Sequence, residues 1–398
     1  MKNNVVEIIA CDKCFKCGTC ISVCPVKAID TKYNNQKGFY DIEVDEIQCV
    51  FCGRCTDVCP AVNNNFNNYS DYIGPFLKLT LAYSANSHIR RMATSGGVVN
   101  SLIRFLLYNK YVDAAIVVTQ KDDEPMNSQV VLINDPIVLE KNPRDFASRY
   151  VSLPVCKYLG MLEPNKKYVM VGTPCQIKGA KAYLSQLKLK NVILFGIACS
   201  GGTSFKATQL VAEKQNNQHA FLRVYYRGEG WPGLNSFYYS NGNMETVINK
   251  PHLRSLFNNM FTSQVFKNKA CRHCQDHFSE QSDISFFDFW NKDEVTNERV
   301  GKSAVLCRTS LGLNVFNDAI ANGIITLGNE ISLSDCLNSQ KWVLVLKKRR
   351  PLVNSISLDM YYRVIDFIWN YKLYNVLPSI TYKMLTVIFL IILKRAGK

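Results

Sequence analysis

Residues 14–25 read CFKCGTCISVCP, and residues 49–60 read CVFCGRCTDVCP. Both stretches have the spacing C-x2-C-x2-C-x3-C-P, which is a ligand pattern of iron–sulfur clusters. In this pattern three closely spaced thiolates bind one [4Fe-4S] cluster, and the fourth Cys of each run binds the cluster of the other run. The repeat therefore predicts two clusters with exchanged ligands, one on Cys14, Cys17, Cys20 and Cys59, and the other on Cys49, Cys52, Cys55 and Cys24.

Two glycines at matching places in the runs, Gly18 and Gly53, support this interpretation. Without a side chain, each lets the backbone fold closely over inorganic sulfide. The alternative is a pair of zinc knuckles, because zinc also binds C-x2-C pairs. Zinc leaves the exchange pattern of eight cysteines unexplained. Cys11 stands one C-x2-C step before Cys14, but it lies outside the repeat and is interpreted as a bystander.

Length, charge and the ends of the chain limit the class of protein. The 398 residues allow two or three domains, and the opening MKNNVVEIIA has too short an apolar run for a signal peptide. We expect a cytoplasmic protein, since thiolates stay reduced there. The formal charge of +15 would suit nucleic acid or an anionic membrane. However, bound clusters would offset part of that charge and no nucleic-acid-binding motif is present, so we expect no nucleic acid partner.

The fold class predicted is an α+β ferredoxin-like module followed by an α/β body and a helical tail. Its proposed limits are a 2[4Fe-4S] module at 1–62, a linker at 63–75, an α/β domain at 76–350 and a tail at 351–398. Apolar patterning predicts helices at 98–106, at 176–187, from about 313 and in the tail. It predicts strands at 5–9, 38–44, 77–83, 112–118, 167–171, 192–198, 283–290 and 303–309, with a hairpin turning at Asn241-Gly242.

Four further cysteines follow or flank predicted strands. Cys175 and Cys199 would stand at the carboxyl ends of two parallel strands, where α/β sheets bind ligands, and Cys271 and Cys274 form a C-x2-C pair. Together they are enough for a third cluster. The alternatives are buried core cysteines or a zinc site that uses His273 or His277. Cys156, Cys307 and Cys336 stand singly in apolar surroundings and are interpreted as core residues.

Two other segments have more than one interpretation. Ser95-Gly96-Gly97 opens a helix, where free N–H groups would suit an anion or simply an ordinary helix cap. Near the end, the apolar stretch 384–393 lies between basic residues and is too short to cross a bilayer. It would lie in the inner membrane interface, pack on its own domain or contact a partner.

With these motifs assembled, the chain resembles the family of coenzyme F420 hydrogenase/dehydrogenase beta subunits, preceded by a fused bacterial-type two-cluster ferredoxin. The motifs that carry the resemblance are Ser95-Gly96-Gly97, Ser148-Arg149-Tyr150, Gly172-Thr173-Pro174-Cys175-Gln176, Cys199 with Gly201 and Ser204, Arg227 with Gly230-Trp231, and Cys271-x2-Cys274 leading to Asp283 and Asp288-Phe289-Trp290.

The resemblance implies an FAD-containing oxidoreductase domain with its own [4Fe-4S] cluster. By motif match that cluster would be held by Cys175, Cys199, Cys271 and Cys274. The flavin would be lined by Ser95, Gly96, Gly97, Ser148, Arg149, Tyr150 and Thr173. Similar fused proteins also occur beside bacterial polysaccharide genes.

The chain departs from the family pattern at three positions. Arg149 stands where Lys is usual, Ser200 where His is common, and Phe287 where Gly is usual. The last two are expected to line the substrate side, which argues against coenzyme F420 as the substrate.

The function predicted is a relay of electrons from a ferredoxin-like donor through three clusters to FAD, and then to a small organic substrate. Clusters carry one electron at a time, and a flavin converts single electrons into pairs. The alternative is a carrier subunit that docks on a separate enzyme and turns over nothing itself.

Overall fold

The structure is a computed structural model, and it describes residues 4–63, 72–121, 128–214, 219, 221–227, 230–233, 236–242, 244–246, 251–347 and 355–396. Parts of three predicted segments lie outside this set: residues 64–71 of the linker, residues 228–229 of the loop after Arg227, and residues 348–350 of the basic stretch.

The N-terminal module contains three short helices and a two-stranded hairpin. Its elements are α1 (Val6–Ala10), α2 (Thr19–Val23), β1 (Ile29–Asn34), β2 (Phe39–Val44) and α3 (Arg54–Asp57). The hairpin is antiparallel, as the alternation at 38–44 indicates. The prediction of a strand at 5–9 is wrong, because helix α1 covers these residues from Val6 onward. There the Asn4 side-chain oxygen accepts a hydrogen bond from the Val6 N–H at 3.1 Å, a local bond that favours a turn over extended backbone.

The body is built on an eight-stranded sheet in the order β13-β3-β12-β11-β7-β6-β4-β5. The four central strands β11, β7, β6 and β4 run parallel, and the outer strands pair antiparallel. Their bounds are β3 (Lys78–Ser84), β4 (Ala114–Gln120), β5 (Ser128–Ile133), β6 (Tyr168–Gly172), β7 (Val192–Ile197), β11 (Ile284–Asp288), β12 (Ser303–Cys307) and β13 (Ile325–Leu327). The parallel neighbours β6 and β7 confirm the crossover predicted from sequence.

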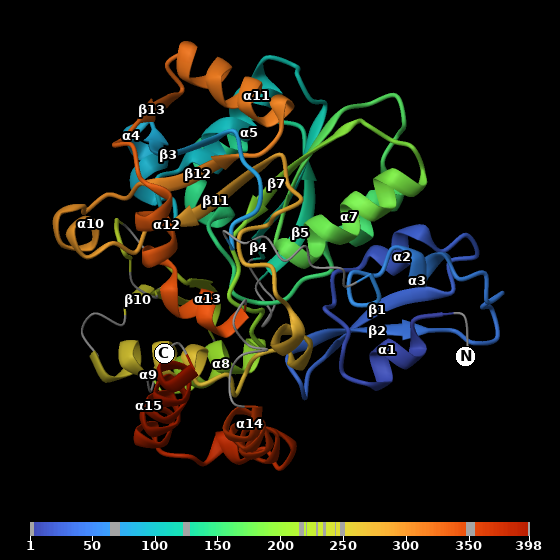
Figure 1. Cartoon of the computed structure of the whole chain (residues 1–398), viewed down its shortest axis with the longest axis vertical. Coiled ribbons are helices and arrows are strands. Elements are labelled where there is room, and N and C mark those ends of the chain that lie inside the picture. Colours follow the sequence, from blue (N-terminus) through green and yellow to red (C-terminus); the bar gives the residue numbers. More distant parts are fainter. Residues whose placement is uncertain are drawn as a thin grey trace.

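Helices cover both faces of this sheet, as Figure 1 shows. Helices α5 (Val98–Tyr108) and α11 (Ser310–Ala321) bury their apolar sides against one face. Helix α7 (Pro174–Gln186) packs on the other face over β6 and β7, and α12 (Leu333–Ser339) adds Cys336 to a core beside it. Because both faces are covered, the central strands are mostly apolar.

The remaining elements of the body include a small second sheet and several short helices. The second sheet consists of β8 (Phe221–Tyr225), β9 (Ser236–Tyr239) and β10 (Met244–Thr246), and the β9–β10 hairpin turns at Asn241-Gly242 as predicted. The helices are α4 (Ser87–Met92), α6 (Ile137–Lys141), η1 (Pro143–Phe146), η2 (Val155–Met161), α8 (Phe205–Glu213), α9 (Pro251–Thr262), η4 (Lys269–His273), α10 (Lys292–Asn297) and α13 (Lys341–Lys347).

The tail is helical, as predicted, and folds back onto the body. It consists of α14 (Ser355–Asn370), η6 (Leu373–Asn375) and α15 (Ser379–Ala396). The Tyr361 hydroxyl donates to the carbonyls of Ser263 and Leu385 at 2.7 and 3.2 Å, which joins α14 to the body and to α15. Helix α15 contacts α9, and Figure 1 shows the red hairpin lying against it.

The module packs directly on the body through α2, which contacts both η2 and α7. The Cys156 N–H donates to the Cys17 carbonyl at 2.9 Å, and the Ser22 hydroxyl donates to the Lys157 carbonyl at 3.0 Å. Apolar residues of the module, the body and the tail belong to one continuous core. The division into domains at 62, 75 and 350 stays a prediction.

Candidate metal centres

The first thiol group consists of Cys14, Cys17, Cys20 and Cys59, which line one partly open cavity. Helix α2 starts immediately after Gly18, which has a left-handed φ of 88° and lies against η2. A Cβ at this glycine would stand 2.9 Å from the Lys157 nitrogen, so only glycine fits both the turn and the close approach.

The thiols of this group act on one another electrostatically. Burial, and then the neighbouring Cys17, Cys14 and Cys59, raise the pKa of the Cys20 thiol well above its ordinary value. Burial and Cys17 raise the pKa of the Cys59 thiol to about 12. Thiols crowded in this way become thiolates when bound metal supplies positive charge. The structure therefore brings Cys59 of the second run to the first run, as ligand exchange requires.

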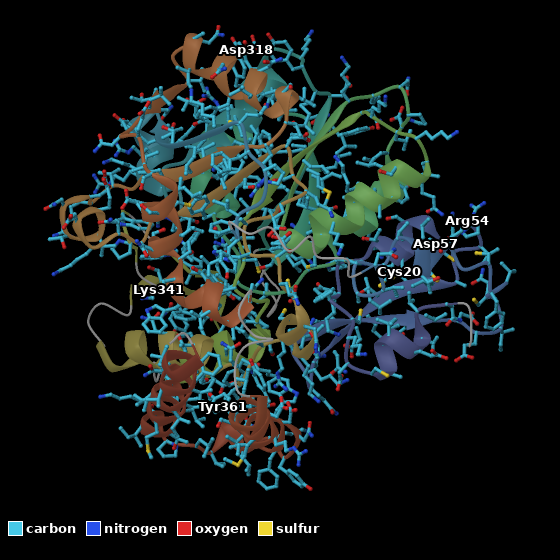
Figure 2. All side chains as sticks on the ribbon, viewed as in Figure 1. Cys20, Arg54, Asp57, Asp318, Lys341 and Tyr361 are labelled. Carbon is cyan, nitrogen blue, oxygen red and sulfur yellow. The ribbon has the colours of Figure 1, made fainter. Side chains whose placement is uncertain are left out.

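The second thiol group lies at the other end of the module. Burial raises the pKa of the Cys55 thiol, and the neighbouring Cys49 and Cys52 add to this effect. Cys24 stands at the end of α2, which contacts α3, and its sulfur accepts a hydrogen bond from the Ala28 N–H at 3.3 Å. In Figure 2, Cys20 lies on the side of the module nearer the body, whereas Arg54, beside Cys55, lies farther out.

The third thiol group consists of Cys175, Cys199, Cys271 and Cys274, which come from three separate segments of the body. Cys175 follows β6 in the first turn of α7, Cys199 follows β7, and the other two belong to or follow η4. Burial, and then Cys199 and Cys274, raise the pKa of the Cys271 thiol to about 11. Burial raises the pKa of the Cys175 thiol, and Cys274 and Cys271 also raise it. Cys271 thus interacts electrostatically with the other three thiols of the group.

Backbone N–H groups point at the sulfurs of this third group. The Gly201 N–H donates to the Cys199 sulfur and the Gly202 N–H to the Cys271 sulfur, both at 3.3 Å. Such bonds favour the thiolate form that an iron–sulfur cluster needs. The donor set and its surroundings fit a [4Fe-4S] cluster.

The alternative zinc site meets an obstacle at His277. Its Nδ1 lies 3.1 Å from the Cys199 carbonyl oxygen and its Nε2 lies 3.1 Å from the Gln340 side-chain oxygen, so both ring nitrogens are engaged. No three His, Cys, Asp or Glu side chains in the described part of the chain are grouped as ligands of a single metal ion. In a [4Fe-4S] cluster, by contrast, each thiolate binds a different iron. The four sulfurs therefore lie farther apart than the ligands of a single metal ion do.

The first and third groups lie next to each other across the interface between module and body. Phe15 and Pro60 of the module face Pro174, Cys175 and Cys274 of the body around one small cavity. Cys17 is also among the causes that raise the pKa of the Cys175 thiol. Asn268, just before η4, donates its side-chain N–H to the Cys14 carbonyl at 3.0 Å.

The residues predicted for the flavin fall into two places at the carboxyl edge of the sheet. Ser95, Gly96 and Gly97 form the turn into α5, where Ser95 donates to the Lys302 carbonyl at 2.7 Å and Gly96 packs on the backbone of β3 and β12. This turn therefore packs closely on the protein itself. The start of a helix at this motif is confirmed.

Ser148, Arg149, Tyr150 and Thr173 form the second place. The Ser148 N–H donates to the Thr94 hydroxyl, and the half-buried Arg149 donates to the Ser128 hydroxyl at 2.8 Å. The Tyr150 hydroxyl accepts from Arg227 at 3.3 Å, and Thr173 caps α7. These side chains are already held by the protein and border the edge where β4 and β6 end.

A buried ion pair at the end of β11 fixes the neighbouring loop. Arg227 pairs with Asp288, and its guanidinium lies beside the stacked rings of Trp231 and Trp290, 5.2 and 5.0 Å from their centres. Burial tends to lower the pKa of Arg227, but Asp288 and Tyr150 outweigh it and raise the pKa. The ion pair thus brings the Arg227 and Asp288 motifs, which are distant in sequence, together in space.

The structure corrects the expectation for Phe287. Its side chain is buried and packs edge-on against Phe278, with ring centres 5.1 Å apart. Successive side chains of β11 point to opposite faces, and Phe287 falls on the face that joins the core with α12. It therefore does not line a substrate side.

Ser200, the other departure from the family pattern, accepts a hydrogen bond from Lys267 through its backbone carbonyl at 3.0 Å.

Sequence reasoning missed three contributors to the thiol groups. Cys156 is a core residue as predicted, yet its thiol also bonds to Cys17 and is the main reason why the pKa of Cys17 falls to about 7. Lys347 and Lys267 are buried beside the third group. The sequence signal that could have predicted a buried lysine is a Lys at the end of an apolar stretch, as in the WVLVLK of α13.

Three protein-family models match the chain. The model described as a 4Fe-4S dicluster domain matches residues 13–63. The models described as the N-term and the C terminus of the coenzyme F420 hydrogenase/dehydrogenase beta subunit match residues 79–159 and 165–332. The chain belongs to this family of beta subunits. In this member of the coenzyme F420 hydrogenase/dehydrogenase family, the dicluster domain precedes the two family regions, as the sequence predicts.

Relatives of this chain are named as parts of oxidoreductases. The chain is 24% identical to a subunit of the F(420)H(2) dehydrogenase of Methanosarcina mazei over 329 residues, which are 80% of this chain and 85% of that protein. It is 24% identical to the beta subunit of the coenzyme F420 hydrogenase of Methanosarcina barkeri over 263 residues, 64% of this chain and 82% of that protein. The chain is thus related to oxidoreductase subunits.

A solved structure shares the fold. A chain of the F420-reducing [NiFe] hydrogenase complex from Methanosarcina barkeri superposes with a TM-score of 0.52 at 21% identity, covering 71% of this chain and 92% of that one. Within the described residues of our structure, no helix has the length and apolarity needed to cross a membrane.

Proposed function

We propose that this chain is an iron–sulfur electron-transfer subunit of an oxidoreductase, which exchanges electrons with a ferredoxin-like partner. The observation that carries the proposal is the shared cavity between module and body, where Phe15 and Pro60 meet Cys175 and Cys274. Two groups of thiols that meet across a docked interface suit the passage of single electrons from one domain to the other.

The proposed ligands follow the three thiol groups. Cys14, Cys17, Cys20 and Cys59 would hold one [4Fe-4S] cluster, Cys49, Cys52, Cys55 and Cys24 the second, and Cys175, Cys199, Cys271 and Cys274 the third. The clusters supply one-electron transfer when bound. The chain itself supplies the thiolates, the N–H groups of Gly201 and Gly202, and the apolar walls that exclude water.

We also propose that FAD binds at the carboxyl edge of the sheet, and the fit rests on Gln120. This residue ends β4, is 6% exposed, and neither its Oε1 nor its Nε2 has a hydrogen-bond partner among the described residues. A buried amide without partners costs about 1–3 kcal/mol, so a ligand with a donor and an acceptor suits this position. Ser128, opposite Gln120 on β5, holds Arg149 beside it.

FAD supplies conversion between single electrons and pairs when it is bound. Around it, Ser148, Arg149, Tyr150 and Thr173 would bind and orient the flavin, with Ser95, Gly96 and Gly97 supporting the edge from α5. The acceptor of the electron pair is proposed to be a small organic substrate.

A carrier subunit that passes electrons to a separate enzyme is the second candidate. Apolar side chains with at least 45% of their surface exposed form one row on α14 and the residue after it, and another row on α15: Met360, Val364, Phe367 and Tyr371, and Ile380, Met384, Val387, Ile388 and Ile391. Exposed rows of this kind favour a protein partner. In that case the body relays electrons and does not itself reduce a substrate.

Anaerobic purification with iron, sulfide, zinc and flavin quantified tests the proposal. The full relay predicts about twelve irons and one FAD per chain, and Cys199→Ser is expected to remove about four irons. Cys307→Ser is the control, since Cys307 is buried in β12 away from the three groups, and it should keep all of them. A preparation with about eight irons and no flavin favours the carrier. Stoichiometric zinc in the first two groups would contradict both.

A further inference from the structure

Two lysines are buried beside the third thiol group. Lys347, the last residue of α13, is 3% exposed, and its Nζ lies 3.3 Å from the Cys274 sulfur and 2.6 Å from the Asp276 carbonyl oxygen. Lys267 is 6% exposed, and its Nζ lies 3.0 Å from the Ser200 carbonyl oxygen and 4.4 Å from the centre of the Phe261 ring. Both ammonium groups are thus removed from bulk water.

A buried ammonium group is costly unless an opposite charge compensates for it. Among the described residues, neither Lys347 nor Lys267 forms an ion pair with a carboxylate. The nearby Asp276 carboxylate accepts the N–H groups of Ser279 and Glu280 and forms no ion pair with either lysine, although its charge still acts on Lys347. The negative charge that lies closest to Lys347 is therefore that of a Cys274 thiolate, whose sulfur is 3.3 Å away.

The first thiol group has a different electrostatic environment. Lys16, which stands between Cys14 and Cys17, directs its Nζ to the Asp41 carboxylate at 2.6 Å. That pair is close to neutral, so the lysine charge is largely cancelled for the first group. Among the described residues, the third group therefore has two buried lysines that form no ion pair, whereas the lysine inside the first run is ion-paired.

We propose that the positive charge of Lys347, supported by that of Lys267, raises the reduction potential of a cluster at the third thiol group. An electron that arrives from the module would then reside mainly on this third cluster. This inference rests on the proposed [4Fe-4S] clusters. One electron leaves a module cluster, which is oxidised, and reduces the third by one unit of charge, with no bond made or broken. Lys347 stabilises that added negative charge through its contact with the Cys274 sulfur. Lys267 adds to this effect from its position next to the Ser200 carbonyl oxygen.

A unit charge at this distance in a protein interior changes the energy of a second charge by more than thermal energy. Removing the charge of Lys347 should therefore move the electron-sharing equilibrium between the third cluster and the module clusters at least about tenfold toward the module. For a one-electron couple a tenfold change corresponds to about 59 mV.

The experiment compares the full-length, anaerobically loaded chain with Lys347→Met and Lys347→Arg. Midpoint potentials of the clusters are measured by redox titration followed by electron paramagnetic resonance. We expect Lys347→Met to lower the potential of the third cluster by about 59 mV or more, to leave the module clusters unchanged, and Lys347→Arg to keep it near the wild-type value. An unchanged third potential in a fully loaded Lys347→Met chain overturns the inference.

Cluster loading separates the remaining outcomes. If Lys347→Met loses about four irons and Lys347→Arg keeps them, the positive charge is needed to hold the third cluster, which supports the inference. If both variants lose them, the side-chain shape matters and the charge does not, which overturns it. If the wild-type chain itself holds only about eight irons, the proposed function fails at the third cluster, independently of Lys347.

Discussion

Docking of the module on the body depends on the close approach of α7 to α2 at Gly179. A Cβ built at this glycine would stand 2.1 Å from the Thr19 hydroxyl oxygen and 3.2 Å from the Thr19 Cβ. Thr19 is fully buried, and its hydroxyl lies 3.3 Å from the Cys17 sulfur. The substitution Gly179→Ala therefore forces Thr19 against the first thiol group or moves the module away from α7.

Two opposing effects determine how much Gly179→Ala changes the free energy of unfolding. In an open helix interior, alanine in place of glycine stabilises by about 1 kcal/mol. An extra methyl group in a filled contact costs about 1–3 kcal/mol. The expected net result is a loss of up to about 2 kcal/mol. Thr19→Ala removes the blocking oxygen, so in that background Gly179→Ala should regain its stabilising effect.

Chemical denaturation of the four loaded chains, as a double-mutant cycle, measures this coupling. We expect Gly179 and Thr19 to be coupled by about 1–3 kcal/mol. If Gly179→Ala alone stabilises the otherwise wild-type chain by about 1 kcal/mol, α7 and α2 do not touch there and the docked arrangement is wrong.

Three further predictions concern other parts of the molecule. Gln120→Leu should stabilise the flavin-free chain by about 1 kcal/mol, because it removes an unsatisfied amide, yet weaken FAD binding in a fluorescence titration; tighter binding would contradict the proposed site. Arg272→Met breaks two hydrogen bonds to Asp366, at 3.0 and 2.8 Å, and should lower the free energy of unfolding by about 1–3 kcal/mol, measured in urea, whereas Arg363→Met at an exposed position of α14 should change it little. Removing iron with a chelator should lower the melting temperature seen by circular dichroism, since ligand binding contributes to folding; an unchanged transition would count against ordered clusters.

The elements that sequence predicts well are those whose signal is local. The strand–turn–helix at 167–187 combines a buried apolar run, a Thr cap with Gln three residues later, and a proline at the first helical position. Each of these cues acts within a few residues. The placement of Cys175 and Cys199 at one sheet edge follows from two such units being parallel.

The features that sequence reasoning misses depend on tertiary contacts. Lys347 reaches Cys274 across 73 positions of chain, and Asn268 reaches the Cys14 carbonyl across 254. No short pattern records such pairs. The strand predicted at 5–9 fails for a different, local reason: a five-residue segment with four apolar residues suits a helix as well as a strand, and the hydrogen bond from the Val6 N–H to the Asn4 side chain favours the helix.

The second thiol group is the one that contains an exposed cysteine. In the second group Cys52 is exposed, and Ile47, Val50 and Phe51 around it are exposed apolar residues. In the first group Cys17 and Cys20 are buried, and the third adjoins it on the far side of Phe15. An external donor can therefore approach the second group closely from the module side. In the proposed ligand exchange each run supplies its last cysteine to the other group, so α2 and α3, which are in contact, would hold the first two clusters at a fixed spacing. The spacing to the third depends on docking, to which the contacts of α2 with η2 and α7 contribute, so a change at Gly179 is expected to affect the proposed electron transfer between module and body.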